Sequence, residues 1–223
     1  MVSLRVIRGY GKVLSEMKDL KTIFILLIFS ALVILFLYQR YHDHSAIRNP
    51  HPSGENIVCF GDSITYGTGA KQGMDYPSQL SGMISRPVIN AGVPGDTTAS
   101  ALRRLEKDVL AHSPQIVLIT LGGNELKNGI SKEAAFQNLK EIITSVQERG
   151  ALVIVGGIDI PLWGKGFGDA YETLCDELGA VLIPNIFKGI MGNRKLMSDQ
   201  IHPNASGYTI MARMFYEAME PYL

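Results

Sequence analysis

The sequence predicts an α/β domain built on a doubly wound, parallel β-sheet in residues 56–223. Two observations favour this fold class. Short apolar runs alternate with segments of helical periodicity, and the links between them are brief. The apolar runs are also continuous rather than alternating in polarity, as expected of strands covered by helices on both faces.

Each expected element has its own signal. The strands are the continuous apolar runs at 56–60, 87–90, 116–121, 151–156 and 180–184. The helices are the periodic segments near 75–85, 97–111, 131–149, 168–178 and 204–220. Ser131 is a favourable start for one helix, and Gly150 is a favourable end. Because ligands bind beyond the carboxyl ends of the strands in such sheets, the residues after each strand are the ones to examine.

An apolar segment at residues 22–38 precedes the domain. It contains no charged residue, and only Thr22 and Ser30 fall outside the apolar set. As a helix it would span roughly 26 Å, close to the ~30 Å of a hydrocarbon core. It is longer than the ~7–15 residues usual for a signal peptide, and no small-x-small cleavage signal follows it. We expect an uncleaved transmembrane anchor; a buried soluble helix and cleavage within residues 1–40 are the alternatives.

The charge distribution orients this segment. The basic residues ahead of it are Arg5, Arg8, Lys12, Lys18 and Lys21. Only Arg40 and Arg48 lie between it and the domain. The positive-inside rule then places the N-terminus in the cytoplasm and the domain in the periplasm or outside the cell. The whole chain has 21 basic and 21 acidic residues, and this neutral balance speaks against a nucleic-acid partner.

We therefore expect four parts in the chain. They are a cytoplasmic basic segment (1–21), the transmembrane anchor (22–38), a linker (39–55) and the catalytic domain (56–223). Three of the five His residues fall in the polar linker. A metal site needs ligands that converge on a scaffold, which a linker does not offer, so no metal site is expected.

Four polar segments are expected at one rim of the sheet. Residues 61–67 (GDSITYG), 90–98 (NAGVPGDTT) and 122–125 (GGNE) follow the first three strands. Residues 199–204 (DQIHPN) come just before the last helix. Since the carboxyl ends of parallel strands share an edge, these segments are expected to lie close together.

The residue types in these segments fit nucleophilic catalysis. Ser63 lies where the first strand ends, and a serine hydroxyl becomes a good nucleophile when a base takes its proton. His202 is the candidate base, because the domain's other histidine, His112, falls at the amino end of a strand. Asp199 precedes His202 by three residues, so it can orient the imidazole and stabilise the imidazolium. The backbone N–H groups of Ser63 and Gly95 and the amide of Asn124 are candidate oxyanion donors.

The four segments resemble the four sequence blocks of the SGNH (GDSL) hydrolase family. Within it, the domain is similar to the bacterial thioesterase I/lysophospholipase and arylesterase branch, through GDSITYG, VINAGVPGDTT, ITLGGNE and DQIHPNASG. The resemblance implies a flavodoxin-like sheet, Ser63 as nucleophile, Asp199 and His202 as its partners, and no cofactor. The family spacing implies Gly95 rather than Gly92 as the oxyanion glycine, and it implies Asn124 as the third donor.

Two positions depart from the branch. Glu125 stands where an aspartate is usual, and Asp159 replaces a residue that is often basic. Residues 158–164 align with a loop that lines the acyl pocket in the thioesterase branch. The resemblance therefore implies that Ile160, Pro161 and Trp163 contact the substrate.

The expected function is a membrane-anchored serine esterase that hydrolyses carboxylic ester or thioester bonds of small acyl or lipid-like substrates through an acyl-enzyme. A carbohydrate O-acetyl esterase is one alternative. A non-catalytic, membrane-tethered binding module is another, since a fold does not by itself imply an activity. The sequence specifies neither the physiological substrate nor an oligomeric state.

Overall fold

The computed structural model describes residues 24–34, 46–159 and 166–223. The chain divides into two compact units, residues 1–45 and residues 46–223. We describe each unit by itself.

In the first unit, residues 24–34 form a helix. Its apolar side chains are exposed; those of Phe24, Phe29 and Ile34 are each more than 60% accessible (63%, 65% and 66%). The rest of the expected anchor (22–38) and all of residues 1–21 lie outside the described residues. In the ranges that the structure covers, no helix combines the length and apolar character needed to cross a membrane.

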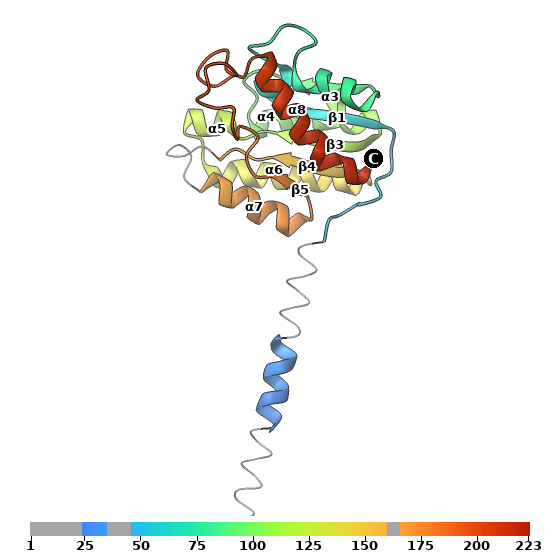
Figure 1. Cartoon of the computed structure of the whole chain (residues 1–223). Coiled ribbons are helices and arrows are strands. Elements are labelled where there is room, and N and C mark those ends of the chain that lie inside the picture. Colours follow the sequence, from blue (N-terminus) through green and yellow to red (C-terminus); the bar gives the residue numbers. More distant parts are fainter. Residues whose placement is uncertain (1–23, 35–45, 160–165) are drawn as a thin grey trace, which may run out of the picture. The chain divides into compact units, whose positions relative to one another are not determined.

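The second unit contains a five-stranded parallel sheet in the order β2-β1-β3-β4-β5 (Figure 1). The strands are β1 (Asn56–Gly61), β2 (Val88–Gly92), β3 (Pro114–Thr120), β4 (Leu152–Gly156) and β5 (Val181–Ile183). This order is that of a flavodoxin-like, doubly wound sheet, so the predicted fold class is confirmed. The strand order reverses between β1 and β3, and both strands end next to the polar segments.

Burial explains the sequence pattern of the strands. The central strands β1, β3 and β4 are buried almost throughout, whereas the edge strands β2 and β5 are partly exposed. Within the sheet, Ile57 pairs with Val88 on one side and with Ile116 on the other. Helices cover both faces, so both sides of each central strand must be apolar.

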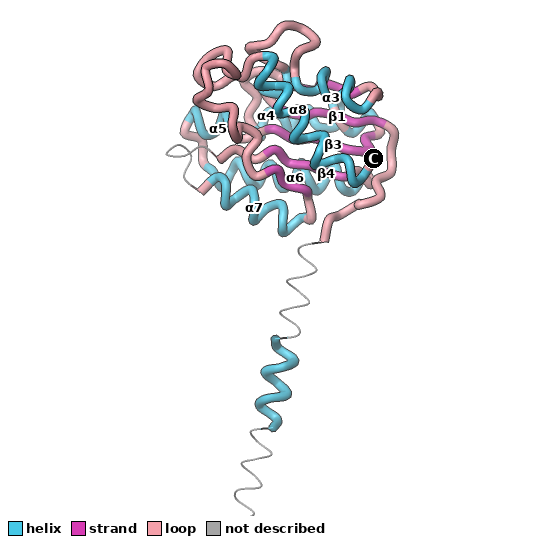
Figure 2. The backbone as a smooth tube through the Cα atoms, in the orientation of Figure 1, coloured by secondary structure: helices cyan, strands magenta, loops and turns pink. Residues whose placement is uncertain are grey.

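The helices form a layer on each face of the sheet (Figure 2). One layer contains α3 (Tyr76–Ile84) and α8 (Ala205–Met219); the other contains α4 (Thr98–Asp108), α6 (Lys132–Glu148) and α7 (Phe167–Leu178). Two short helices, α2 (Ser63–Tyr66) and α5 (Gly123–Asn128), were not predicted, because they are too short for helical periodicity. Two 3₁₀ turns, η1 (Leu110–His112) and η2 (Glu220–Tyr222), follow α4 and α8.

The domain begins earlier than the sequence predicts. Residues 46–55, assigned to the expected linker, belong to the compact unit. The N–H groups of Arg48 and Ser53 donate to the carbonyls of Gly179 and Gly150, at 2.8 and 3.0 Å. The Asn49 amide donates to the carbonyls of Gln147 and Ala151, each at 2.9 Å. These bonds hold the segment against the amino edge of the sheet, whereas residues 39–45 lie outside the described ranges.

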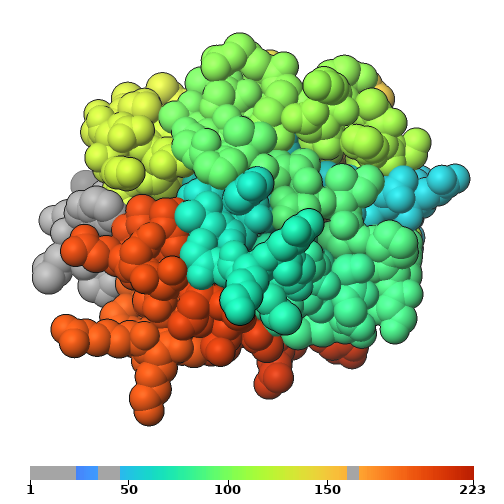
Figure 3. Space-filling view, turned by 90° about the horizontal axis from the view of Figure 1, so that it is seen from above, coloured from blue at the N-terminus to red at the C-terminus, as the bar shows by residue number. Residues whose placement is uncertain are grey.

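The opposite edge of the sheet gathers the polar segments. Figure 3 shows the chain after β1 (teal) lying beside the chain that leads to α8 (orange to red). A hydrogen bond of 2.8 Å from the Tyr208 hydroxyl to the Thr68 carbonyl joins these two regions. The fold therefore brings residues 63 and 202, far apart in sequence, to one place.

Candidate active site

Ser63 is positioned by the turn between β1 and α2. Asp62 caps α2, because its Oδ1 accepts a hydrogen bond of 2.9 Å from the Ile64 N–H. Ser63 is the first residue of this short helix and is partly exposed. Its hydroxyl therefore faces the rim of the sheet, as the sequence predicted.

His202 and Asp199 are positioned by a tight turn ahead of α8. Asp199 Oδ1 accepts from the backbone N–H groups of Ile201 and His202, at 2.8 Å each. Asn204 follows and caps α8 by accepting from the N–H groups of Ser206 and Gly207. The turn thus fixes the imidazole beside its carboxylate.

The three side chains form a continuous hydrogen-bonded line. His202 Nε2 lies 3.0 Å from Ser63 Oγ, and His202 Nδ1 lies 2.7 Å from Asp199 Oδ2. Partial desolvation alone would raise the pKa of Asp199, but the bonds from the His202 ring and the two backbone N–H groups lower it to about 2. Asp199 is therefore ionised throughout the neutral range and can stabilise a positive charge on His202.

The candidate oxyanion donors lie on neighbouring segments. Gly95 adopts a φ of +84°, a conformation that favours glycine. In the part of the chain that the structure describes, the N–H groups of Ser63 and Gly95 donate to no protein acceptor. Gly92 has a different role, because a Cβ there would lie 2.2 Å from the Tyr66 nitrogen. Gly92 allows α2 to pack on β2, which leaves Gly95 as the available glycine donor.

The Asn124 amide is turned toward two acceptors. Its Nδ2 donates to the Asp96 carbonyl at 2.8 Å and to Asp62 Oδ2 at 3.3 Å. The contact with Asp62 is long for a hydrogen bond and is the weaker of the two. Asn124 can therefore give up that contact to an oxyanion and keep its bond to Asp96.

Asp62 is a buried carboxyl group at the site, and its importance was missed from the sequence. It is 4% exposed. Burial raises its pKa to about 7, with further upward contributions from the charges of Glu125 and Asp96, while the Ile64 N–H opposes the shift. An aspartate directly before an expected turn into a helix is a capping signal, and this signal could have singled it out.

Glu125 has a structural explanation. Oε1 of this buried carboxylate accepts a hydrogen bond from the Thr98 N–H at the start of α4. Its Oε2 has no partner among the described residues. The longer side chain thus connects α5 to α4, beside the Gly95–Asp96 loop. Glu125 shapes the site without lying on the line of Ser63, His202 and Asp199.

A small cavity of about 50 Å³ lies beside Ser63. Ser63, Asn124 and His202 contribute polar groups to it. The remaining wall is largely apolar and includes Ile64, Leu126, Ile158, Phe187, Met191 and Ile201. The predicted substrate-binding residues Ile160, Pro161 and Trp163 lie outside the described residues.

Two further residues of the site were missed from the sequence, Asp96 and Arg104. Asp96 is 8% exposed and forms an ion pair with Arg104 at 2.6 Å. The buried positions Ala101 and Leu105 of α4 flank Arg104 along the helix. A charged residue next to the apolar stripe of an amphipathic helix was the available signal.

A serine, a histidine and an aspartate in line at the carboxyl edge of a flavodoxin-like sheet define a serine hydrolase. Within the described ranges, no cluster of three or more His, Cys, Asp or Glu residues could hold a metal ion.

Comparison with known proteins gives the family. A profile of the GDSL-like lipase/acylhydrolase family matches residues 59–210. The chain is 26% identical over 182 residues to an arylesterase of Vibrio mimicus, covering 77% of this chain and 91% of that one. It is also 26% identical over 177 residues to thioesterase 1/protease 1/lysophospholipase L1 of Escherichia coli K12, covering 76% and 85%.

Solved structures agree with this match. The crystal structure of TesA superposes with a TM-score of 0.72 at 26% identity, covering 76% of this chain and all of that one (100%). The chain belongs to the GDSL-like lipase/acylhydrolase family, has the SGNH hydrolase fold and is a serine ester hydrolase.

Proposed function

We propose that Ser63, His202 and Asp199 hydrolyse carboxylic ester or thioester bonds through an acyl-enzyme. The observation that carries this proposal is the line from Ser63 Oγ through the imidazole to Asp199, with distances of 3.0 and 2.7 Å. His202 Nε2 takes the Ser63 proton as Oγ attacks the carbonyl carbon. The imidazolium then gives that proton to the departing alcohol or thiol. A water molecule, activated by His202, attacks the acyl-enzyme and releases the acid.

The oxyanion of each tetrahedral intermediate is expected to accept from three donors. Among the described residues, the N–H groups of Ser63 and Gly95 have no other acceptor. The Asn124 amide joins them by leaving its 3.3 Å contact with Asp62. Each such donor contributes about 3 kcal/mol to lowering the barrier.

The apolar cavity beside Ser63 supports an acyl group as the part of the substrate that it holds. The names of the two relatives, arylesterase and thioesterase 1/protease 1/lysophospholipase L1, agree with ester and thioester substrates. We therefore propose small acyl esters, thioesters or lipid-like esters as the substrate class.

The similarity to a Geobacillus stearothermophilus protein named acetylxylan esterase supports one second candidate, an O-acetyl esterase acting on carbohydrate. Comparing acetylated oligosaccharides with aryl esters separates the two proposals, and a higher kcat/KM on the sugars would select the second. The alternative of a non-catalytic binding module is not supported, because the named relatives are esterases and the three side chains are in line.

We also propose that residues 22–38 anchor the enzyme in a membrane, with the N-terminus in the cytoplasm and the catalytic unit in the periplasm or outside the cell. The uncharged sequence of the segment and the basic residues before it support this proposal. In isolated membranes, the chain should resist alkaline extraction. In intact spheroplasts, protease added to the medium should reach the catalytic unit. Release into the soluble fraction would contradict the proposal.

Hydrolysis of p-nitrophenyl butyrate by the wild type and Ser63→Ala tests the proposed mechanism. Ser63→Ala should lose at least about 10³-fold in kcat, because the nucleophile is absent. Ser206→Ala is the matched control, since this serine is exposed on α8. Equal rates for the wild type and Ser63→Ala would refute the mechanism.

A further inference from the structure

We propose that Arg104 is a positioning residue for the oxyanion hole. It holds the loop that carries Gly95 against the end of β1 that leads to Ser63. We name this arrangement the Arg104 clamp and define it as Arg104 with two of its three acceptors, Asp96 and Gly61. The inference rests on the proposed function, since it concerns the donors that stabilise the tetrahedral intermediate.

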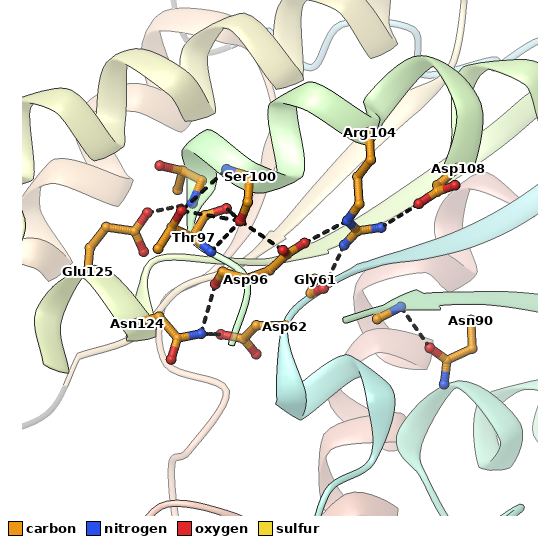
Figure 4. Close-up of polar contacts among 12 residues, drawn as sticks. Gly61, Asp62, Asn90, Asp96, Thr97, Ser100, Arg104, Asp108, Asn124 and Glu125 are labelled. Atoms are coloured by element: carbon orange, nitrogen blue, oxygen red, sulfur yellow. Dashed lines mark hydrogen bonds and ion pairs between the residues drawn. The ribbon is translucent and has the colours of Figure 1, made fainter. Parts of the chain in front are cut away.

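Figure 4 shows the polar contacts of Arg104. Arg104 Nε donates to Asp96 Oδ2 at 2.6 Å, and Arg104 Nη2 donates to the Gly61 carbonyl at 3.0 Å. Nη1 donates to Asp108 at 3.2 Å, one turn further along α4. The guanidinium carbon also lies 4.4 Å from the centre of the Phe60 ring. Because the guanidinium is planar and its donors are fixed, these contacts hold their acceptors in one geometry.

The two acceptors of the clamp are neighbours of the oxyanion donors. Asp96 directly follows Gly95, and Gly61 is two residues before Ser63. The backbone carbonyl of Asp96 also accepts from the Asn124 amide at 2.8 Å. Asp96 therefore connects the third donor to the same clamp, and the positions of the Gly95 and Asn124 donors depend on where Asp96 lies.

Asp96 is held from its other side by Ser100. The Ser100 hydroxyl donates to Asp96 Oδ1 at 2.7 Å and accepts from the Thr97 N–H at 2.8 Å. The side chains of Arg104 and Asp96 are only 16% and 9% exposed, so solvent screens their ion pair much less than a surface pair. Loss of Arg104 would leave Asp96 partly paired in a buried position, and the Gly95–Asp96 loop would move to solvate it.

The clamp is expected to affect kcat more than KM. Arg104 does not line the cavity beside Ser63, so its removal leaves the acyl contacts in place. A displacement of the donors by about 1 Å can lower the rate about 10²-fold, because oxyanion stabilisation depends on donor position. We therefore expect Arg104→Met to lower kcat by about 10–100-fold and to change KM by less than about 3-fold.

The test compares variants of the full chain in mild detergent, with p-nitrophenyl butyrate as substrate. The variants are Arg104→Met, Arg104→Lys, Asp96→Asn and the double variant Arg104→Met/Asp96→Asn. Arg103→Met is the matched control, because Arg103 is the exposed neighbour on the same helix. A fluorophosphonate that labels Ser63 counts the folded, reactive sites, so each kcat refers to active enzyme only. Ser63→Ala run in parallel tests the proposed function itself.

We expect Arg103→Met to match the wild type and Arg104→Lys to recover part of the lost kcat. Since Arg104 acts through Asp96, the double variant should lose about as much kcat as the more affected single variant, not the product of both losses. The inference is refuted if Arg104→Met and Arg103→Met have the same kcat per labelled site. It is also refuted if the two losses multiply in the double variant. Full activity in Ser63→Ala would instead refute the proposed function.

Discussion

The raised pKa of Asp62 predicts a specific pH dependence of stability. The ordinary pKa of the group is 3.8, and burial, with the charges of Glu125 and Asp96, raises it to about 7 in the folded protein. Between these values the folded chain keeps a proton that the unfolded chain has released. The free energy of unfolding therefore decreases as pH rises from about 4 to about 7, and it levels off above.

The size of this effect follows from the shift. A shift of about 3 pKa units corresponds to about 4 kcal/mol over the whole range, at about 1.4 kcal/mol per unit. Between pH 5 and pH 8 the contribution of Asp62 falls by about 3 kcal/mol. Asn in its place can still accept from the Ile64 N–H but does not titrate. Asp62→Asn should therefore not lose this unfolding free energy between pH 5 and pH 8. The cost of placing an amide next to the Asn124 amide does not depend on pH, so it does not enter the comparison.

Urea denaturation of residues 46–223 at pH 5 and pH 8 measures the effect. The quantity compared is the loss of unfolding free energy between the two pH values in the wild type and in Asp62→Asn. Asp176→Asn, at an exposed position, is the control for removing a carboxylate and should behave as the wild type. Equal losses in the wild type and Asp62→Asn would refute the buried, proton-binding role of Asp62.

Three further outcomes are expected. Asp199→Asn should lower kcat on p-nitrophenyl butyrate about 10³-fold. This loss is smaller than the ~10⁴-fold loss typical of a buried triad aspartate, because the Asp199 side chain is 53% exposed. An unchanged kcat would exclude Asp199 as the partner of His202. Asn49→Ala should lower the free energy of unfolding by about 2 kcal/mol, since it removes two hydrogen bonds and places alanine at a φ of +56°. His51→Ala, in the same segment, should have little effect on urea denaturation. Residues 56–223 should unfold at lower urea concentration than residues 46–223, and equal midpoints would show that residues 46–55 contribute nothing.

The sheet could be predicted because its signal is local. Each central strand contains a continuous apolar run, such as 116–119 in β3 (Pro114–Thr120), since both of its faces are buried. The site could be predicted because ligands bind beyond the carboxyl ends of the strands in such sheets. Ser63 and His202 were therefore expected to lie close together, although they are 139 residues apart in the sequence.

The parts that could not be predicted depend on contacts distant in sequence. Residues 46–55 look like a linker because they are polar, and only contacts distant in sequence, such as those with the carbonyls of Gly150 and Gly179, make them part of the domain. Arg104 looks like a solvated helix residue until Gly61 and Asp96 are placed beside it. No local pattern contains these partners, because the tertiary fold alone brings them together.

Chemical labelling determines directly which residue is the nucleophile. The full chain is treated with a fluorophosphonate and digested, and the labelled peptide is found by mass spectrometry. We expect one phosphonylated residue, Ser63, with labelling and ester hydrolysis lost in parallel and much slower labelling in His202→Ala. Labelling at another residue, or an active enzyme with Ser63 unlabelled, would contradict it.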